Sequence, residues 1–313
     1  MTSGLEDVTV VIPTLNEEEA IGKVLDEVLA QGIPRENVIV VDGYSTDRTR
    51  EIAKEKGVRV ILQEGKGKTD AVKTAINYVK TPITVLMDGD YTYPAKYIPI
   101  LASKIREGYD LVIGRRIPQK NAQKPIFDLG NKLLSKTFNL LYGIKLKDVL
   151  SGMYAVRTSI LRELLYVSKG FGIESEIVAH VASTGGRIAE IPIEYRARIG
   201  KKKLGVKHGL HIFIDMLKLA WYYNPTLIIF GLGIIFLLIP GLILVGYVGY
   251  EYLAHGVKYY VKGLIGVALT SAGIISLMLT LQTIFLKRME IRITKHIRSL
   301  KEEKCGKEQA VQQ

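Results

Sequence analysis

The sequence is poor in cysteine and shows no secretory segment at its start. Cys305 is its only cysteine, so an intramolecular disulfide framework is excluded. The N-terminal stretch MTSGLEDVTV has neither a basic segment nor a long apolar one, and no signal peptide is expected there. Acidic residues are in the minority, since 43 Lys and Arg face 31 Asp and Glu and give a formal charge of +12. This balance favours anionic partners such as nucleic acid, phosphorylated substrates or an acidic membrane surface.

Two long stretches, 226–250 and 264–286, lack charged residues altogether. As a helix, the first would be roughly 38 Å long, enough to cross a hydrocarbon core of about 30 Å. Two buried helices of a soluble protein are the alternative, but runs of this length favour a transmembrane hairpin over residues 226–286. Lys and Arg are dense before the first run and within 287–313, and sparse in the connecting loop. The positive-inside rule therefore predicts a multi-pass cell-membrane protein whose N-terminal domain, basic tail 287–313 and both termini are cytoplasmic.

The segment 206–225, directly before the first uncharged run, has the spacing of an amphipathic helix. On a helix, His211, Asp215, Lys218 and Tyr222 form one polar stripe, and most other positions are apolar. This pattern predicts an interfacial helix that lies among the lipid headgroups. A core helix of the soluble domain is the alternative.

Residues 1–205 alternate short apolar runs with segments of helical spacing, which predicts an α/β domain. The runs are continuously apolar, as in parallel strands that are covered on both faces. A Rossmann-like, mostly parallel sheet is therefore expected, with ligands at the carboxyl ends of its strands. The runs that we expect to be strands are 8–13, 38–42, 58–62, 83–88 and 111–114.

Two carboxylates, Asp88 and Asp90, follow the fourth apolar run directly. Oxygen ligands of this kind suit Mg²⁺ or Mn²⁺, and such a cation can hold a diphosphate and neutralise it as it leaves. A lone Asp-x-Asp is most often a solvated turn, but its place at the end of a buried strand strengthens the prediction of a metal site.

These motifs together resemble a known family. In order along the chain they are IPTLNEEEAI, VVDGYSTDRT, KGKTDAVKTAI, LMDGDYTYPAKYIP, LVIGRR, DVLSGMYAVR and GFGIESEI. The set resembles the inverting family 2 glycosyltransferases of GT-A fold. It is most similar to their polyprenyl-phosphate members, the dolichyl-phosphate mannose synthase-like enzymes, and the variant DGDYTYP resembles archaeal sequences. The resemblance covers residues 8 to about 205.

The resemblance implies how a nucleotide sugar is held. It assigns a metal to Asp88 and Asp90, the nucleobase to Asp42, and support of the nucleotide to Lys68 in a flexible glycine loop. In mannose synthases a glutamine follows at the position of Thr92 here, which leaves the third metal ligand open. The remaining donor-site residues are Pro13, Asn16 and Glu17; Asn16 could also cap a helix.

The resemblance also implies an acceptor phosphate site at Arg116, Ser135, Arg196 and Arg198. Attraction to anionic lipids is the alternative for these cations, but the planar guanidinium suits phosphate oxygens. Asp90, Arg116 and Arg198 are the expected catalytic residues. Glu176 is a candidate orienting acid with a structural role as its alternative. A phosphomonoester oxygen is already ionised, so no strong general base is needed.

The expected function is metal-dependent, inverting transfer of a hexose or N-acetylhexosamine from a nucleotide diphosphate sugar to dolichyl or polyprenyl phosphate, as in protein N-glycosylation. UDP-glucose or UDP-N-acetylglucosamine is favoured, because Gly43 replaces a second carboxylate after Asp42 that guanine would use. A GDP-mannose-dependent enzyme is the alternative, ahead of a polysaccharide synthase or a non-catalytic membrane scaffold. The lipid bilayer is an expected partner; nucleic acid is not, because no stacking-aromatic motif occurs.

Overall fold

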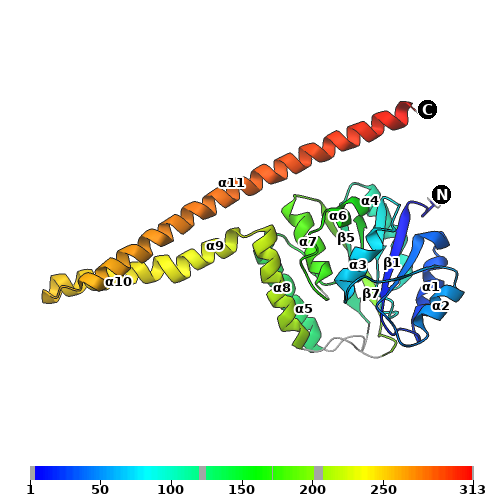
Figure 1. The fold of residues 1–313 in the computed structure, drawn as a ribbon, viewed down its shortest axis with the longest axis horizontal. Helices are drawn as coiled ribbons and strands as arrows, with labels where there is room; N and C mark the ends of the chain where they lie inside the picture. The colour runs from blue at the N-terminus through cyan, green and yellow to red at the C-terminus, as the bar shows by residue number, and fades with distance from the viewer. Residues whose placement is uncertain (1–3, 120–124, 171, 201–206, 312–313) are drawn as a thin grey trace. The chain divides into compact units, whose positions relative to one another are not determined.

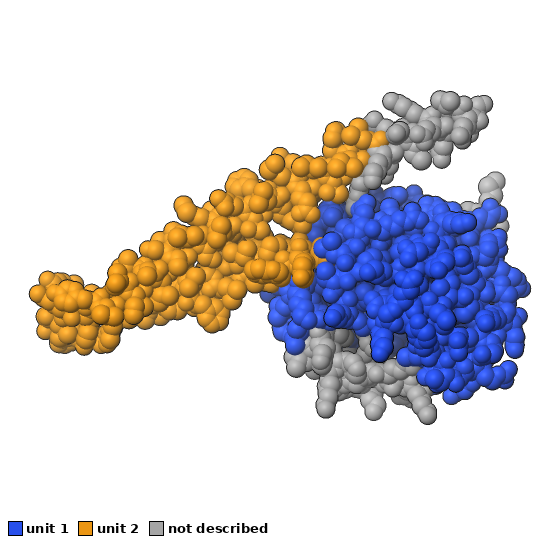
Figure 2. Space-filling model, in the orientation of Figure 1, with its two compact units in different colours: residues 1–219 blue, residues 220–313 orange. Residues whose placement is uncertain are grey.

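The computed structural model describes residues 4–119, 125–170, 172–200 and 207–311. The chain forms two compact units, Met1–Leu219 and Ala220–Gln313. Figure 2 colours them separately. The first unit contains the whole sheet, and the second consists of helices.

A seven-stranded sheet in the order β3-β2-β1-β4-β6-β5-β7 forms the centre of the first unit. Only β6 is antiparallel to its neighbours, β4 and β5, so the predicted mostly parallel sheet is confirmed. All five expected runs are strands, whereas β6 and β7 were not predicted. The strands are β1 (Val8–Thr14), β2 (Val38–Asp42), β3 (Arg59–Leu62), β4 (Ile83–Leu86), β5 (Leu111–Pro118), β6 (Tyr154–Arg157) and β7 (Ile188–Tyr195).

Helices cover both faces of this sheet (Figure 1). Along β1, Val10 and Ile12 join the core cluster formed with α1 and α4, while Val11 between them is also buried. Burial on both faces explains why the central strands are continuously apolar. The helices of this unit are α1 (Ile21–Leu29), α2 (Thr49–Glu55), α3 (Lys68–Ile76), α4 (Ile98–Arg106), α5 (Pro125–Tyr142), α6 (Thr158–Glu163), α7 (Ile173–Ser183) and α8 (Lys207–Tyr223), with short 3₁₀ turns η1 (Arg35–Asn37) and η2 (Ala95–Tyr97).

The segment expected to be amphipathic is helical as α8, and the first compact unit extends into it, to Leu219. Met216 and Leu219 are buried, whereas Ile214 and Leu217 are partly exposed. In the predicted polar stripe, Lys218 Nζ lies 3.1 Å from Asp215 Oδ1. The helix therefore packs one face into the domain and leaves apolar side chains exposed on another. Its position at a membrane interface stays a prediction.

The second unit is a helical hairpin of α9 (Thr226–Leu232), the π-helix η3 (Gly233–Leu238), α10 (Ile239–His255) and α11 (Tyr260–Val311). Two of its segments, Thr226–His255 and Tyr260–Thr294, are long and apolar enough to cross a membrane, and 18-residue windows within them have mean hydropathies of 2.9 and 2.1. The π-helix ends just before Pro240, whose missing N–H interrupts the regular bonding of a helix. Residues 287–311, expected as a basic tail, continue α11 without a break.

Glycines let the two helices of the hairpin approach closely. A Cβ added to Gly241 would lie 2.5 Å from the backbone nitrogen of Thr270, and one on Gly273 would lie 2.7 Å from Leu238 Cα. The hydroxyl of Ser276 also donates across the hairpin to the carbonyl of Ile229 at 3.1 Å. Small residues and interhelical hydrogen bonds of this kind stabilise helix pairs in lipid.

Substitution of Gly273 by leucine should therefore separate the hairpin, because the new side chain meets the backbone of the opposite helix. We expect a loss of about 1–3 kcal/mol, typical of overpacking, measured as thermal unfolding in detergent micelles. Gly246→Leu is the matched control, since nothing described lies within 4 Å of a Cβ at that position. Equal losses in both variants would contradict the proposed contact.

Candidate active site

Loops that follow β1, β2 and β4 meet at the carboxyl edge of the sheet and hold unusual backbone conformations. Asn16, Tyr44 and Tyr91 have φ values of 51°, 66° and 69°. These are three of the four non-glycine residues with positive φ in the described parts of the chain. Such conformations are costly for ordinary residues and cluster at functional sites. This edge of the sheet is therefore a candidate functional site.

Asp42, at the end of β2, is fully buried, but only one of its two carboxylate oxygens has hydrogen-bonding or ionic partners among the described residues. Its Oδ2 accepts a hydrogen bond from the backbone N–H of Ser45 at 2.9 Å and lies 3.6 Å from Arg50 Nε. Its Oδ1 is buried and has no hydrogen-bond partner among the described residues. Leaving a buried acceptor unpaired costs about 1–3 kcal/mol. A ligand N–H could satisfy this oxygen.

Asn16 joins the loops that follow β1 and β2 and does not cap a helix. Its side-chain oxygen accepts from the backbone N–H of Thr46 at 2.8 Å, and its own N–H donates to Ser45 Oγ at 2.9 Å. Helix α1 begins later, at Ile21. The helix-cap alternative for Asn16 is therefore wrong. Pro13 lies nearby on β1, opposite Val41 of β2.

Arg198 connects Asp90 to Glu17. Its Nη1 donates to Asp90 Oδ2 at 2.9 Å, and its Nη2 donates to Glu17 Oε1. The other oxygen of Asp90 accepts from the hydroxyl and the N–H of Thr92, at 2.5 and 3.1 Å. Thr92 is buried and holds Asp90 in place. It therefore orients one carboxylate of the pair.

Lys68 is the second cation of this edge and lies between two acids. Its Nζ is 2.5 Å from Asp88 Oδ1 and 2.6 Å from Glu174 Oε1. Burial lowers the pKa of Lys68, but the two carboxylates outweigh it and hold that pKa well above its ordinary value. Lys68 was expected in a flexible loop; it is instead the buried first residue of α3.

The edge carries more negative than positive charge. Asp88, Asp90, Glu17 and Glu174 supply four carboxylates against the two cations Lys68 and Arg198. Burial, and then the nearby charge of Asp88, raise the pKa of Asp90. A divalent cation beside Asp88 and Asp90 would relieve this imbalance, so these residues fit a metal.

The protein supplies few metal ligands at this edge. In the described residues no group of three or more His, Cys, Asp or Glu side chains is arranged to hold a metal ion. A cation at Asp88 and Asp90 would therefore take further oxygens from a bound ligand or from water, as Mg²⁺ commonly does.

Arg196 lies in a different set of contacts from Arg198. Its Nη1 pairs with Glu27 Oε1 on α1 at 2.7 Å, and its guanidinium lies 4.6 Å from the centre of the Tyr91 ring. Burial raises the pKa of Glu27, but the hydrogen bond from Arg196 and other bonds lower it overall. Arg196 and Arg116, both expected at one phosphate, thus pair with different acids, Glu27 and Asp148.

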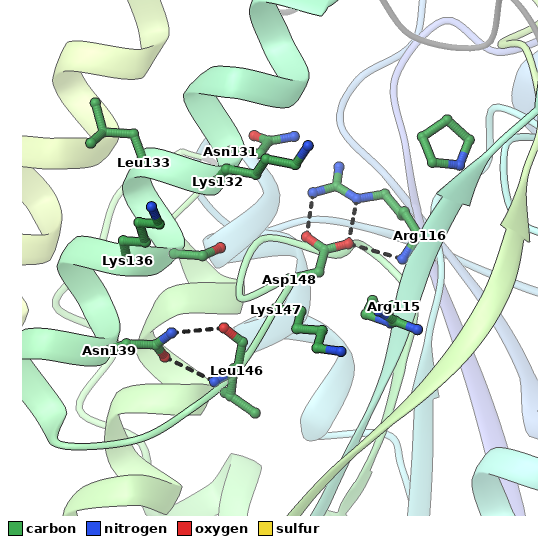
Figure 3. A pocket seen from close by; sticks show the side chains of 12 residues that line it. Arg115, Arg116, Asn131, Lys132, Leu133, Lys136, Asn139, Leu146, Lys147 and Asp148 are labelled. Carbon is green, nitrogen blue, oxygen red and sulfur yellow. Dashed lines mark hydrogen bonds and ion pairs between the residues drawn. The ribbon is translucent and has the colours of Figure 1, made fainter.

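Arg116 and Ser135 line a basic cavity of about 520 Å³ between β5, α5 and the loop before β6. In Figure 3 the α5 side chains Lys132 and Lys136 face Arg116 and Asp148 across it. Arg116 makes a two-pronged ion pair with Asp148, with Nε to Oδ2 at 2.8 Å and Nη2 to Oδ1 at 2.6 Å. Other cationic and amide residues of the lining are Arg115, Lys147, Asn131 and Asn139.

Two tyrosines connect this cavity to the acidic edge. The Arg116 guanidinium lies 5.6 Å from the Tyr195 ring, whose centre is 5.2 Å from that of Tyr93. The Tyr93 hydroxyl accepts from the N–H of Gly152 at 2.7 Å. A Cβ on Gly152 would lie 2.3 Å from Asp88 Oδ2, so a larger residue there would displace this carboxylate. Tyr195, Tyr93 and Gly152 thus form a continuous set of contacts between Arg116 of the cavity and Asp88.

Glu176 is fully buried and has structural partners. Its carboxylate accepts from the N–H groups of Val167 and Ser168, at 3.0 and 2.9 Å, and from the Ser168 hydroxyl at 2.5 Å. The same loop contacts α3, where the N–H of Thr69 donates to the Gly170 carbonyl at 3.1 Å. Glu176 therefore holds the loop against the helix that begins at Lys68.

Comparison with known proteins agrees with this geometry. The model of the family described as glycosyl transferase family 2 matches residues 9–165. The chain belongs to this family. The predicted family and the predicted glycosyltransferase activity are confirmed.

Two relatives from Haloferax volcanii extend the comparison. The glycosyltransferase AglJ is 32% identical over 297 residues, which cover 90% of this chain and 97% of that protein. A dolichyl-phosphate hexose transferase is 38% identical over 200 residues, or 64% of this chain and 87% of that protein. The first comparison extends beyond the sheet-containing unit, because it covers most of the chain.

The fold is also that of solved glycosyltransferase structures. A glucosyl-3-phosphoglycerate synthase from Mycobacterium tuberculosis, in complex with Mn²⁺, UDP and glucosyl-3-phosphoglycerate, superposes with a TM-score of 0.56. It is 24% identical and covers 68% of this chain and 77% of that one. The expected GT-A-like architecture is confirmed.

Replacement of Glu176 by alanine should destabilise the domain by about 2–4 kcal/mol, because the buried N–H and hydroxyl of Ser168 and the partly buried N–H of Val167 lose their acceptor. Urea unfolding measures the effect. Glu107→Ala, which removes an exposed carboxylate of the surface pair with Lys104, is the control and should change stability by at most about 0.5 kcal/mol. A folded, normally stable Glu176→Ala protein without transferase activity would instead indicate a chemical role.

Proposed function

We propose that this protein transfers a hexose or N-acetylhexosamine from a UDP-sugar to dolichyl or polyprenyl phosphate, with inversion at the anomeric carbon. The observation that carries the proposal is a pair of sites of opposite character, the acidic edge around Asp88 and the basic cavity around Arg116, connected by contacts through Tyr195 and Tyr93. A nucleotide sugar with its metal suits the first, and a phosphate suits the second. The dolichyl-phosphate hexose transferase relative supports the same pairing of substrates.

The donor half of the site follows from the acidic edge. The free oxygen of Asp42 can accept an N–H of the base, and Asp88 and Asp90 can hold Mg²⁺ or Mn²⁺. When bound, the metal neutralises the diphosphate and assists its departure. Lys68 and Arg198 add fixed positive charge beside the two aspartates. Mn²⁺ and UDP are both present in the glucosyl-3-phosphoglycerate synthase complex, which supports this assignment.

The acceptor half requires orientation more than proton transfer. An acceptor phosphate oxygen attacks the anomeric carbon and forms the new C–O bond, while the bond to the donor diphosphate breaks and the nucleoside diphosphate leaves. The attacking oxygen carries charge already, so no general base is needed. Arg116 can hold the phosphate against its repulsion from the diphosphate. The apolar hairpin and the exposed side of α8 would bring the domain to the membrane that contains the lipid, with both termini cytoplasmic.

The direct test is a vesicle assay that offers labelled nucleotide sugars and identifies the lipid product. Asp90→Asn should reduce transfer about 100-fold or more, because the metal loses a charged ligand and Arg198 its charged partner. Mn²⁺ binding in the presence of UDP, measured by calorimetry, should fall with it.

Asp26→Asn is the matched control, since Asp26 is an exposed carboxylate paired with Lys56. It should leave both measurements unchanged. Near-normal turnover by Asp90→Asn, with a metal still required, would remove Asp90 from the metal site. Absence of any lipid-linked product from the wild-type protein, with every donor offered, would overturn the proposed function.

The base preference can be tested separately. Uracil has one N–H on its pairing edge and guanine has two donors there, while Asp42 offers one free oxygen. At Gly43 a Cβ would lie 3.2 Å from both Gln63 Oε1 and the Thr14 carbonyl, so the chain leaves little room for a second side-chain acceptor. An unpaired donor costs about 1–3 kcal/mol, so UDP should bind roughly 5- to 150-fold more tightly than GDP. Competition between UDP and GDP for the protein, at the same Mg²⁺ concentration, measures this difference in affinity. Tighter binding of GDP would favour the GDP-mannose alternative.

A further inference from the structure

One acidic residue, Asp148, lies in the wall of a cavity that is otherwise basic. Arg115, Arg116, Lys132, Lys136 and Lys147 supply the positive charges of that wall. A carboxylate here opposes the binding of any phosphate, since like charges repel strongly where water is scarce. Asp148 must therefore contribute something to the site that offsets its repulsion of a phosphate.

The contacts of Asp148 point to that role, because both of its oxygens bind Arg116. Oδ2 accepts from the backbone N–H of Arg116 at 3.0 Å and from Nε at 2.8 Å, and Oδ1 accepts from Nη2 at 2.6 Å. This arrangement uses two of the five side-chain donors of the guanidinium and fixes its plane. Among the described residues Nη1 has no hydrogen-bond acceptor, so it remains available to a ligand.

Asp148 is itself held in place by Glu190 on β7. Glu190 Oε1 accepts from the N–H of Asp148 at 2.9 Å and from the N–H of Lys147 at 2.8 Å. Glu190 pairs with Ile113 of β5, the strand that also carries Arg116. The loop before β6 is thus tied to the same pair of strands that positions the arginine.

We propose that Asp148, anchored by Glu190, is a positioning residue that aims Arg116 at the acceptor phosphate. The inference rests on the proposed function, since it presumes that a phosphate occupies the cavity. Fixing the guanidinium before the ligand arrives reduces the entropy lost on binding, which outweighs the repulsion from one carboxylate whose charge Arg116 neutralises.

The test measures binding of a short-chain polyprenyl phosphate and of UDP to the full-length protein in detergent. Asp148→Ala should weaken phosphate binding about tenfold and leave UDP binding unchanged. In the Arg116→Ala background, Asp148→Ala should cause no further loss, because it acts only through that arginine. Asp148→Glu should restore part of the affinity. Asp26→Ala, which removes an exposed carboxylate elsewhere, controls for net charge.

Three results would overturn the inference. Tighter phosphate binding by Asp148→Ala would mean that repulsion dominates. A further loss in the Arg116→Ala background would mean that Asp148 acts independently of the arginine. Weaker UDP binding together with a lower melting temperature would indicate a role in folding. Failure of the wild-type protein to bind the phosphate would instead count against the proposed function and is separable from all three.

Discussion

Asp88 and Asp90 lie one residue apart at the end of a buried strand, where their charges repel unless cations lie close to both. Lys68 and Arg198 supply these cations from segments far away in the sequence, and each also binds a second acid. This charge balance holds the loops after β1 and β4, the start of α3, the start of α7 and the segment after β7 in one place. The strained backbone at Asn16 and Tyr91 persists because these contacts fix the loops around it.

The need to neutralise like charges that lie close together also applies to two anionic substrates in one site. A nucleotide diphosphate and a phosphate monoester repel each other, so the protein must neutralise both without joining them. In the proposed function, two separate groups of side chains serve this purpose. Carboxylates that can hold a cation, Asp88 and Asp90, follow β4, and arginine and lysine side chains line the cavity between β5 and α5. Tyr195 contacts Arg116 of the second group and Tyr93, which in turn binds Gly152 beside Asp88 of the first.

The acids of the site differ in role because they differ in partners. Asp42 has an unpaired oxygen among the described residues, Asp148 orients an arginine, and Glu176 binds backbone N–H groups of a neighbouring loop. Glu174, two residues before Glu176 on the same helix, instead faces Lys68. Positions two apart on a helix point in different directions, so one acid enters the site and the other supports the loop.

Local sequence determined the strands β1 to β5, the two apolar helices and the aspartates at the end of β4, because hydrophobic runs and their flanks are local properties. It did not reveal β6, which is antiparallel and so lies outside the expected series of parallel strands, or β7, in which Glu190, Pro192 and Glu194 interrupt the apolar residues. The resemblance to the family placed Arg116, Ser135 and Lys68 among the site residues but could not show their partners. Asp148, Glu174 and Glu27 gained their roles only from tertiary contacts with residues 32 to 169 positions away. Such pairings depend on which loops the sheet order brings together, and no local spacing encodes that.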